Sequence, residues 1–317
     1  MTPQRIIRGY YIIAGTFTLS ASLIWGVNTL FLLGAGLNIA EVFIANAFYT
    51  LGMMLFEIPT GVIADTLGRR ASFLLSASVL MLATLGYVAG SLLGAGLAWF
   101  IVFSVLIGLG FTFYSGAVEA WLVDALKAVG YTDPLDRVFA RASQLTSAAM
   151  LIGSVGGGII GTFNLAVPYV VRAVLLGIAF VVAFRTMHDI GYQPRPLALR
   201  RIPEELARLT RSSIQFGWRE PRLRLLMAMA FIQMGFMLWA FYAWQPYFLA
   251  LYGDPNAVWI AGIVTALLSV ATIAGGMVAD RYARRPNRRT TLIVGAVAVF
   301  ALAMIGIGLT SVFVVAV

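Results

Sequence analysis

The chain has no cysteine and a single histidine, His188, which excludes disulfides, thiolate metal sites and cysteine nucleophiles. A zinc or di-iron enzyme needs a ligand cluster that this sequence lacks, so we expect no metal and no cofactor. Charged residues are also scarce, at 11% of the 317 residues, whereas a soluble domain has about 25%. Hydrophobic residues make up 61%. A chain of this composition needs lipid around it.

Long apolar runs fill most of the sequence. Taking about 20 residues per membrane span, we identify nine. The first run is of full spanning length and has no signal-peptide cleavage site, so it is interpreted as a helix. The sequence therefore predicts an all-α polytopic membrane protein with spans at residues 10–33, 41–64, 71–90, 97–123, 139–161, 166–186, 223–250, 257–279 and 290–310.

The position of the cations predicts the orientation. A net charge of +9 would suggest a nucleic-acid partner, but every Lys and Arg except Arg172 falls in segments on one side of the predicted topology. This is the positive-inside pattern. We therefore expect a multi-pass protein of the cell membrane with a cytoplasmic amino terminus, in contact with lipid and not with nucleic acid. Arg172 lies about two turns inside its span, where it either marks a functional site or extends to the lipid headgroups.

Residues 187–222 interrupt the apolar pattern with four prolines and many arginines. The run that begins at Pro203 has two glutamates in its first turn and arginines further along, which favours a short amphipathic helix on the membrane surface. Binding of anionic lipid and a simple solvated connection both remain open for it. The chain is thus divided into a six-helix bundle, a linker and an incomplete second bundle, at residues 1–186, 187–222 and 223–317.

A charged ten-residue motif occurs twice, at residues 61–70 and 276–285. Each copy follows an apolar segment and forms a polar hinge, and roughly six segments per repeat predict a duplicated six-helix unit. In each copy, a glycine one turn before an aspartate allows close approach of a neighbouring helix. An arginine four residues after the aspartate can pair with it. The motif therefore predicts a breakable latch built around Asp65 with Arg69, and around Asp280 with Arg284.

The stretch from Phe56 to Arg70 resembles the signature between the second and third helices of the major facilitator superfamily. The second copy resembles its counterpart between the eighth and ninth helices, and the resemblance covers the whole chain. It implies a monomeric transporter with about nine of twelve helices present: a complete first half and a partial second half. It also implies that Asp65 faces the eleventh helix and that Arg69 pairs with Asp124, while Asp280 lies near residues 136–142. The expected latch residues are Gly61, Asp65, Gly68, Arg69, Arg70, Asp124, Gly276, Asp280, Arg284 and Arg285. Alternatively, these charges only set the topology.

Two carboxylates, Glu57 and Glu119, lie clearly inside predicted spans. Burial would favour their protonated form, so they are candidates for proton coupling; alternatively, they hydrogen-bond neighbours and stabilise the bundle. The sequence departs from the family at Ser104, where an arginine is often found four residues before the glycine. The glycines of 153–161 lack the proline common in antiporters. Those glycines, and the ones at 108, 110 and 116, predict close helix contacts.

A substrate cavity is expected at the midplane between the two halves. Aromatic and amide side chains with little charge suit a small amphiphilic or weakly cationic molecule. The cavity candidates are Trp25, Asn28, Asn46, Tyr49, Tyr114, Gln144, Gln233, Trp239 and Tyr242.

The favoured function is proton-coupled efflux of such compounds by alternating access. The alternatives are uptake or uniport of a metabolite and a non-transporting scaffold or receptor, and an enzyme is the weakest option. Because three further helices are implied after residue 317, we expect these 317 residues alone not to transport.

Overall fold

The computed structural model describes residues 2–192, 202–254 and 289–310, with the shorter pieces 257–260, 262–264, 267, 270–271 and 274–275. All regular structure in these residues is helical, which confirms the all-α prediction. The helices are α1 Pro3–Ser22, α2 Asn28–Gly34, α3 Ile39–Leu67, α4 Arg69–Leu93, α5 Leu97–Tyr114, α6 Ala117–Ala128, α7 Asp136–Phe163, α8 Val167–Thr186, α9 Ile202–Arg219, α10 Pro221–Tyr252 and α12 Arg289–Leu309.

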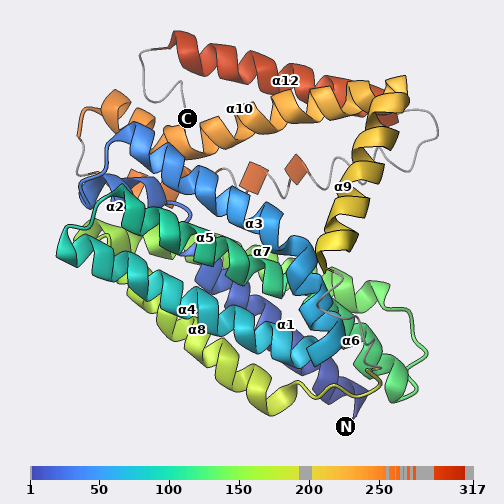
Figure 1. Ribbon diagram of the computed structural model, residues 1–317. Helices are drawn as coiled ribbons and strands as arrows, with labels where there is room; N and C mark the ends of the chain where they lie inside the picture. The colour runs from blue at the N-terminus through green and yellow to red at the C-terminus, as the bar shows by residue number, and fades with distance from the viewer. Residues whose placement is uncertain are drawn as a thin grey trace.

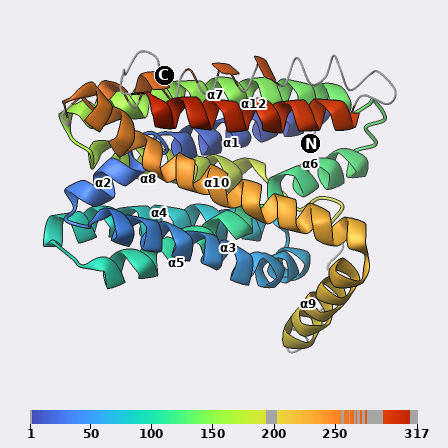
Figure 2. The same ribbon diagram turned by 90° about the horizontal axis from the view of Figure 1, so that it is seen from above.

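The long helices run back and forth between two ends of a bundle (Figure 1). At one end, which we call the basic end, lie the amino terminus, Gly68 and the connections 129–135 and 187–192. The opposite end holds the connections 35–38, 94–96 and 164–166. This alternation agrees with the predicted order of spans. Figures 1 and 2 both show α10 and α12 lying along one side of the bundle formed by α1 to α8, with α9 at a steep angle to it.

Six described helical stretches are long and apolar enough to cross a membrane: 39–67, 69–93, 97–128, 136–163, 167–186 and 223–252. The predicted first span is broken into α1 and α2 by turns at residues 23–27, and the fourth is broken into α5 and α6 at Ser115 and Gly116. Gly116 adopts φ +69°, a left-handed conformation that ends α5 and that the apolar pattern could not reveal. The predicted eighth span lies largely outside the described residues, and α12 occupies the ninth.

Glycines bring helix backbones into contact, as predicted for part of the set. A Cβ atom at Gly108 in α5 would lie 2.5 Å from the carbonyl oxygen of Tyr49 in α3. One at Gly157 in α7 would lie 2.7 Å from the carbonyl carbon of Leu23. Gly156 has no described atom within 4 Å of such a position, so it does not take part. The pairs α3 with α5 and α1 with α7 thus pack backbone against backbone, which gives the bundle its close contacts in lipid.

These contacts predict different effects for two adjacent substitutions in α7. Gly157→Ala should lower the free energy of unfolding by about 1–3 kcal/mol, because the added methyl group meets the backbone of Leu23. Gly156→Ala is the matched control and should be neutral or slightly stabilising, since alanine favours a helix. Thermal unfolding of both variants in detergent tests this. Equal stability of the two variants would contradict the packing described for α1 and α7.

Candidate functional site

The first copy of the repeated motif lies at the basic end and contains an ion pair. The Arg69 guanidinium lies 2.8 Å from Asp65 Oδ1 across one turn, as the sequence predicted. The expected partner Asp124 makes no ion pair with Arg69 in the described part of the chain. Arg69 is therefore held by the carboxylate of its own motif, because that partner is only four residues away.

A second carboxylate, Asp189, also contacts this motif. Its Oδ1 accepts a hydrogen bond of 3.0 Å from the backbone N–H of Arg70, at the start of α4. Gly68 precedes that helix with φ +102°, and a side chain there would collide with Asp189. The Arg70 guanidinium donates to the carbonyl oxygen of Phe184. Sequence reasoning missed Asp189, because it is 119 residues away from Arg70 and no local pattern connects the two.

Residues 187–192 cross the basic ends of the helices and hold them together. The indole Nε1 of Trp121 in α6 donates to the carbonyl oxygen of His188 at 2.9 Å. Tyr192 lies near the charges of Arg69, Asp65 and Asp189, and burial raises the pKa of its hydroxyl group. The start of the predicted linker is therefore part of the latch region.

The other parts of the predicted latch either lack the expected helix contact or lie outside the described residues. Gly61 is exposed and has no described atom within 4 Å of a built Cβ, so the close helix approach expected there is not seen among the described residues. The second copy, with Gly276, Asp280, Arg284 and Arg285, lies outside the described residues. Its role stays a prediction.

The two proton-coupling candidates lie near the break between α5 and α6. Ser115 at the break donates a hydrogen bond of 3.0 Å to Glu57 Oε1 in α3, and Glu119 is in the first turn of α6. Both side chains lie on the exposed faces of their helices, outside the buried core, and their part in proton coupling stays a prediction. They face away from the core of the bundle because their helices bury the opposite side.

A buried glutamine supplies hydrogen bonds to the backbone groups at the break between α1 and α2. In an unbroken helix the N–H of Thr29 would bond the carbonyl oxygen of Trp25. Here the carboxamide of Gln245 in α10 is inserted between them: its Nε2 donates to Trp25 O at 2.8 Å, and its Oε1 accepts from Thr29 N at 3.1 Å. Gln245 is 1% exposed. The Thr29 hydroxyl adds a 3.0 Å bond to the carbonyl oxygen of Tyr242. Two backbone groups that would otherwise lack partners are thereby satisfied by another span.

Several predicted cavity residues meet beside this break. The Asn28 amide donates to Asn46 Oδ1 at 3.1 Å, and the hydroxyl of Tyr169 donates to Asn28 Oδ1 at 2.8 Å. Tyr49 lies one turn from Asn46 on α3, and Tyr242 of α10 interacts electrostatically with Tyr49. Asn28, Asn46, Tyr49 and Tyr242 therefore form one polar and aromatic cluster, together with the backbone of Trp25.

The remaining cavity candidates are placed elsewhere. Tyr114 stacks on Phe17 with ring centres 3.6 Å apart, so it belongs to the packed core of the bundle. Gln144 and Gln233 are exposed. The side chain of Trp239 lies outside the part of the chain that the structure describes.

Arg172 is buried inside the bundle, with 2% of its surface exposed. The expectation that it extends to the lipid headgroups is therefore wrong. Its guanidinium carbon lies 5.8 Å from the ring centre of Phe111 in α5. The reason is its place on α8: it shares the face of Tyr169, Ala173 and Leu176, which packs into the bundle.

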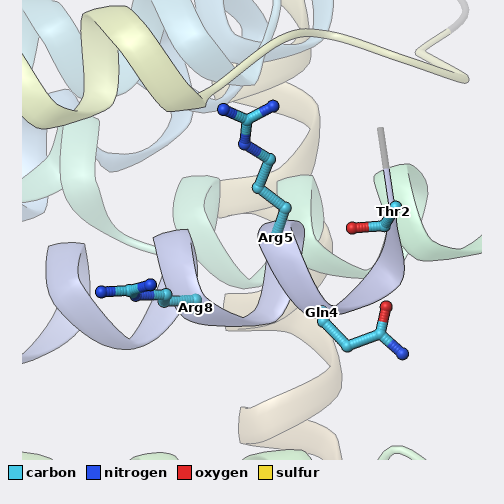
Figure 3. Close-up of a pocket in the computed structure, with 4 residues that line it drawn as sticks. All are labelled: Thr2, Gln4, Arg5 and Arg8. Carbon is cyan, nitrogen blue, oxygen red and sulfur yellow. The ribbon is translucent and has the colours of Figure 1, made fainter.

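A polar hollow of about 530 Å³ lies at the amino end of α1, away from this cluster. It is lined by Thr2, Gln4, Arg5 and Arg8, and Figure 3 shows their side chains spread around the first turns of the helix. Its position at the basic end agrees with the predicted placement of cations on one side.

Comparison with known proteins identifies the family. The sequence model of the Major Facilitator Superfamily matches residues 10–317. The tetracycline resistance protein, class E, of Escherichia coli is 29% identical over 153 residues, which are 48% of this chain and 36% of that protein. The match thus spans about a third of the relative's length.

One solved structure is similar in fold, and a second superposes less well. A D-xylose-proton symporter superposes with a TM-score of 0.57 at 15% identity, over 99% of this chain and 76% of the symporter. A POT family transporter, PepTSo, gives a TM-score of 0.47 at 15% identity, over 97% of this chain and 59% of that one.

The contact of Gln245 predicts a large effect of one substitution. Gln245→Leu should lower the free energy of unfolding by about 1–3 kcal/mol for each group left without a partner, since Trp25 O and Thr29 N–H lose their bonds in an apolar surrounding. Gln233→Leu is the matched control, because Gln233 is exposed on the same helix. Thermal unfolding in detergent measures both. A Gln245→Leu variant as stable as Gln233→Leu would contradict the role given to this side chain.

Proposed function

Because this chain belongs to the Major Facilitator Superfamily, we propose that the protein to which these residues belong is a secondary active transporter that exports small amphiphilic compounds in exchange for protons by alternating access. The similarity to a protein named for tetracycline resistance, over 48% of this chain, supports export of a toxic compound. The polar and aromatic cluster around Asn28, Asn46 and Tyr49 supports a small-molecule cavity.

The observation that carries this proposal is the Gln245 contact. It joins α10, from the proposed second half, to the break in the first span of the proposed first half. The contact consists of two hydrogen bonds made by the Gln245 carboxamide and one donated by the Thr29 hydroxyl. These bonds can be exchanged for other partners when the halves separate. With the basic end assigned to the cytoplasm, the contact lies toward the outside, and the described arrangement is then a state closed to the outside.

At the basic end, the pair of Asp65 with Arg69 and the Asp189 cap on α4 form the first half's share of the latch. In this proposal the pair changes partners when the second half docks. Charges that exchange partners at a membrane edge suit a two-state contact, since neither state leaves a carboxylate or guanidinium alone.

Glu57 is the proposed proton-coupling group, with Glu119 beside it. The bond from Ser115 ties the charge state of Glu57 to the break between α5 and α6. A neutral carboxyl accepts such a bond more weakly than a carboxylate does, so in this proposal the proton acts through the contact with Ser115.

Efflux measurements on cells that express the protein from its gene test the proposal. A panel of neutral, cationic and anionic toxic amphiphiles identifies a compound that the cells export, and a pH-sensitive dye follows proton movement. Glu57→Gln should reduce proton-driven efflux to the rate of cells without the gene, because it removes the titrating group. Glu204→Gln on α9, an exposed glutamate, is the matched control and should leave efflux unchanged.

Two results would count against the proposal in different ways. Compound movement without proton movement in the wild type would favour uniport. Unchanged efflux in Glu57→Gln, with proton movement intact, would assign the coupling to another group.

A further inference from the structure

Arg172 is a buried cation without a counterion in the described part of the chain. Its Nε has no hydrogen-bond partner, and no ion pair involves its guanidinium. The groups that act on it electrostatically are the hydroxyls of Tyr169, Tyr49 and Tyr87, and no carboxylate is among them. Burying an ionised side chain this way is strongly unfavourable unless a partner joins it.

Two of the three tyrosine hydroxyls are already in use. Tyr169 donates to Asn28 Oδ1 at 2.8 Å, and the Tyr87 hydroxyl is hydrogen-bonded to that of Ser104. The hydroxyl of Tyr49 has no hydrogen-bond partner among the described residues, and it interacts electrostatically with the same guanidinium.

Tyr49 is also the most accessible of the three tyrosines around Arg172. It is half-buried, whereas Tyr87 and Tyr169 are fully buried. Its ring meets Phe111 edge-on at 5.9 Å, and Phe111 lies under the Arg172 guanidinium. Tyr242 of α10 lies close to Tyr49 and also contacts Phe43, with ring centres 6.2 Å apart. Tyr49 therefore lies on the α3 side that faces α10, where the proposed cavity is, and Arg172 lies behind it inside the bundle.

We propose that Arg172 and Tyr49 form an anion-binding subsite of this cavity, and that the transported compound is an amphiphilic organic acid. The guanidinium pairs with the carboxylate of the compound, the Tyr49 hydroxyl donates to it, and the rings of Tyr49 and Phe111 contact its apolar body. This inference rests on the proposed function and replaces the weakly cationic compound suggested by composition. A fixed positive charge at this place repels a cation.

An anionic lipid is a less suitable occupant, because Arg172 packs on the inward face of α8 beside Ala173 and Leu176, away from lipid. A purely structural arginine would be expected to bond carbonyl or carboxylate oxygens of its neighbours. None is bonded to it in the described residues.

Binding of matched probes to the purified protein tests the subsite. The probes are 2-naphthoate, its neutral amide, and 2-naphthylmethylammonium, in a non-ionic detergent without anionic lipid, with affinity measured by calorimetry. The wild type should bind naphthoate in preference to the amide and the ammonium. Arg172→Gln should weaken naphthoate binding roughly 10- to 100-fold and leave the amide unchanged. Tyr49→Phe should weaken it less.

Arg185→Gln is the matched control, since Arg185 is an exposed arginine on the same helix, and it should bind naphthoate as the wild type does. Arg172→Lys keeps the charge and should retain part of the affinity. Equal naphthoate affinity in Arg172→Gln and the wild type would overturn the proposal, as would stronger wild-type binding of the amide.

If neither Arg172 variant folds, labelling of wild-type arginines with phenylglyoxal decides the question. Naphthoate should protect Arg172 and leave Arg185 labelled. Labelling of Arg172 that naphthoate does not alter, or its absence in every condition, would contradict a ligand site there.

The efflux assay separates this inference from the proposed function. Proton-driven export of neutral compounds by the Arg172→Gln variant would support a transporter. If the same variant also bound naphthoate as tightly as the wild type, the subsite alone would be rejected. If Arg172→Gln lost naphthoate binding while the wild type exported no compound, the subsite would stand and the transporter would be rejected.

Discussion

In lipid, a backbone N–H or C=O group without a hydrogen-bond partner is strongly unfavourable, and this constraint determines how α10 meets the bundle. The break at residues 23–27 leaves such groups on Trp25 and Thr29, and the carboxamide of Gln245 satisfies both. Because that contact fixes α10 beside α2, it also brings Tyr242 against Phe43 of α3. The proposed cavity cluster, the boundary between the proposed halves and the proposed closure of the opposite end all depend on this one bridge.

Charges occupy two levels of the bundle, and each level suits a different task. At the basic end, Asp65, Arg69 and Asp189 lie close together, with partners within reach and some access to water. Such groups exchange partners readily. Deeper in the bundle, Arg172 is enclosed by aromatic rings and has no described counterion, so an anion that enters there meets little competition. The latch and the proposed subsite therefore lie in separate electrostatic surroundings of one scaffold.

Local patterns in the sequence predicted what depends on near neighbours. The apolar runs predicted the order of the spans, and the four-residue spacing predicted the pair of Asp65 with Arg69. The glycines of α7 predicted a close helix contact, and the structure shows that its partner is the end of α1. Features that depend on distant residues were missed. The break between α1 and α2 needs Gln245, more than 200 residues later, and the α4 cap needs Asp189. For Arg172, burial and extension to the headgroups both stayed open, because sequence alone did not show which face of α8 packs inward.

A distance measurement between spin labels at Ala40 and Ala250 tests most directly whether the Gln245 bridge holds the opposite end closed. Both alanines are exposed, one at the start of α3 and one near the end of α10, and the chain has no native cysteine to interfere. The wild type should show one short distance, and Gln245→Leu should add a longer one as α10 separates from α2. An identical distance distribution in the two proteins would contradict the account.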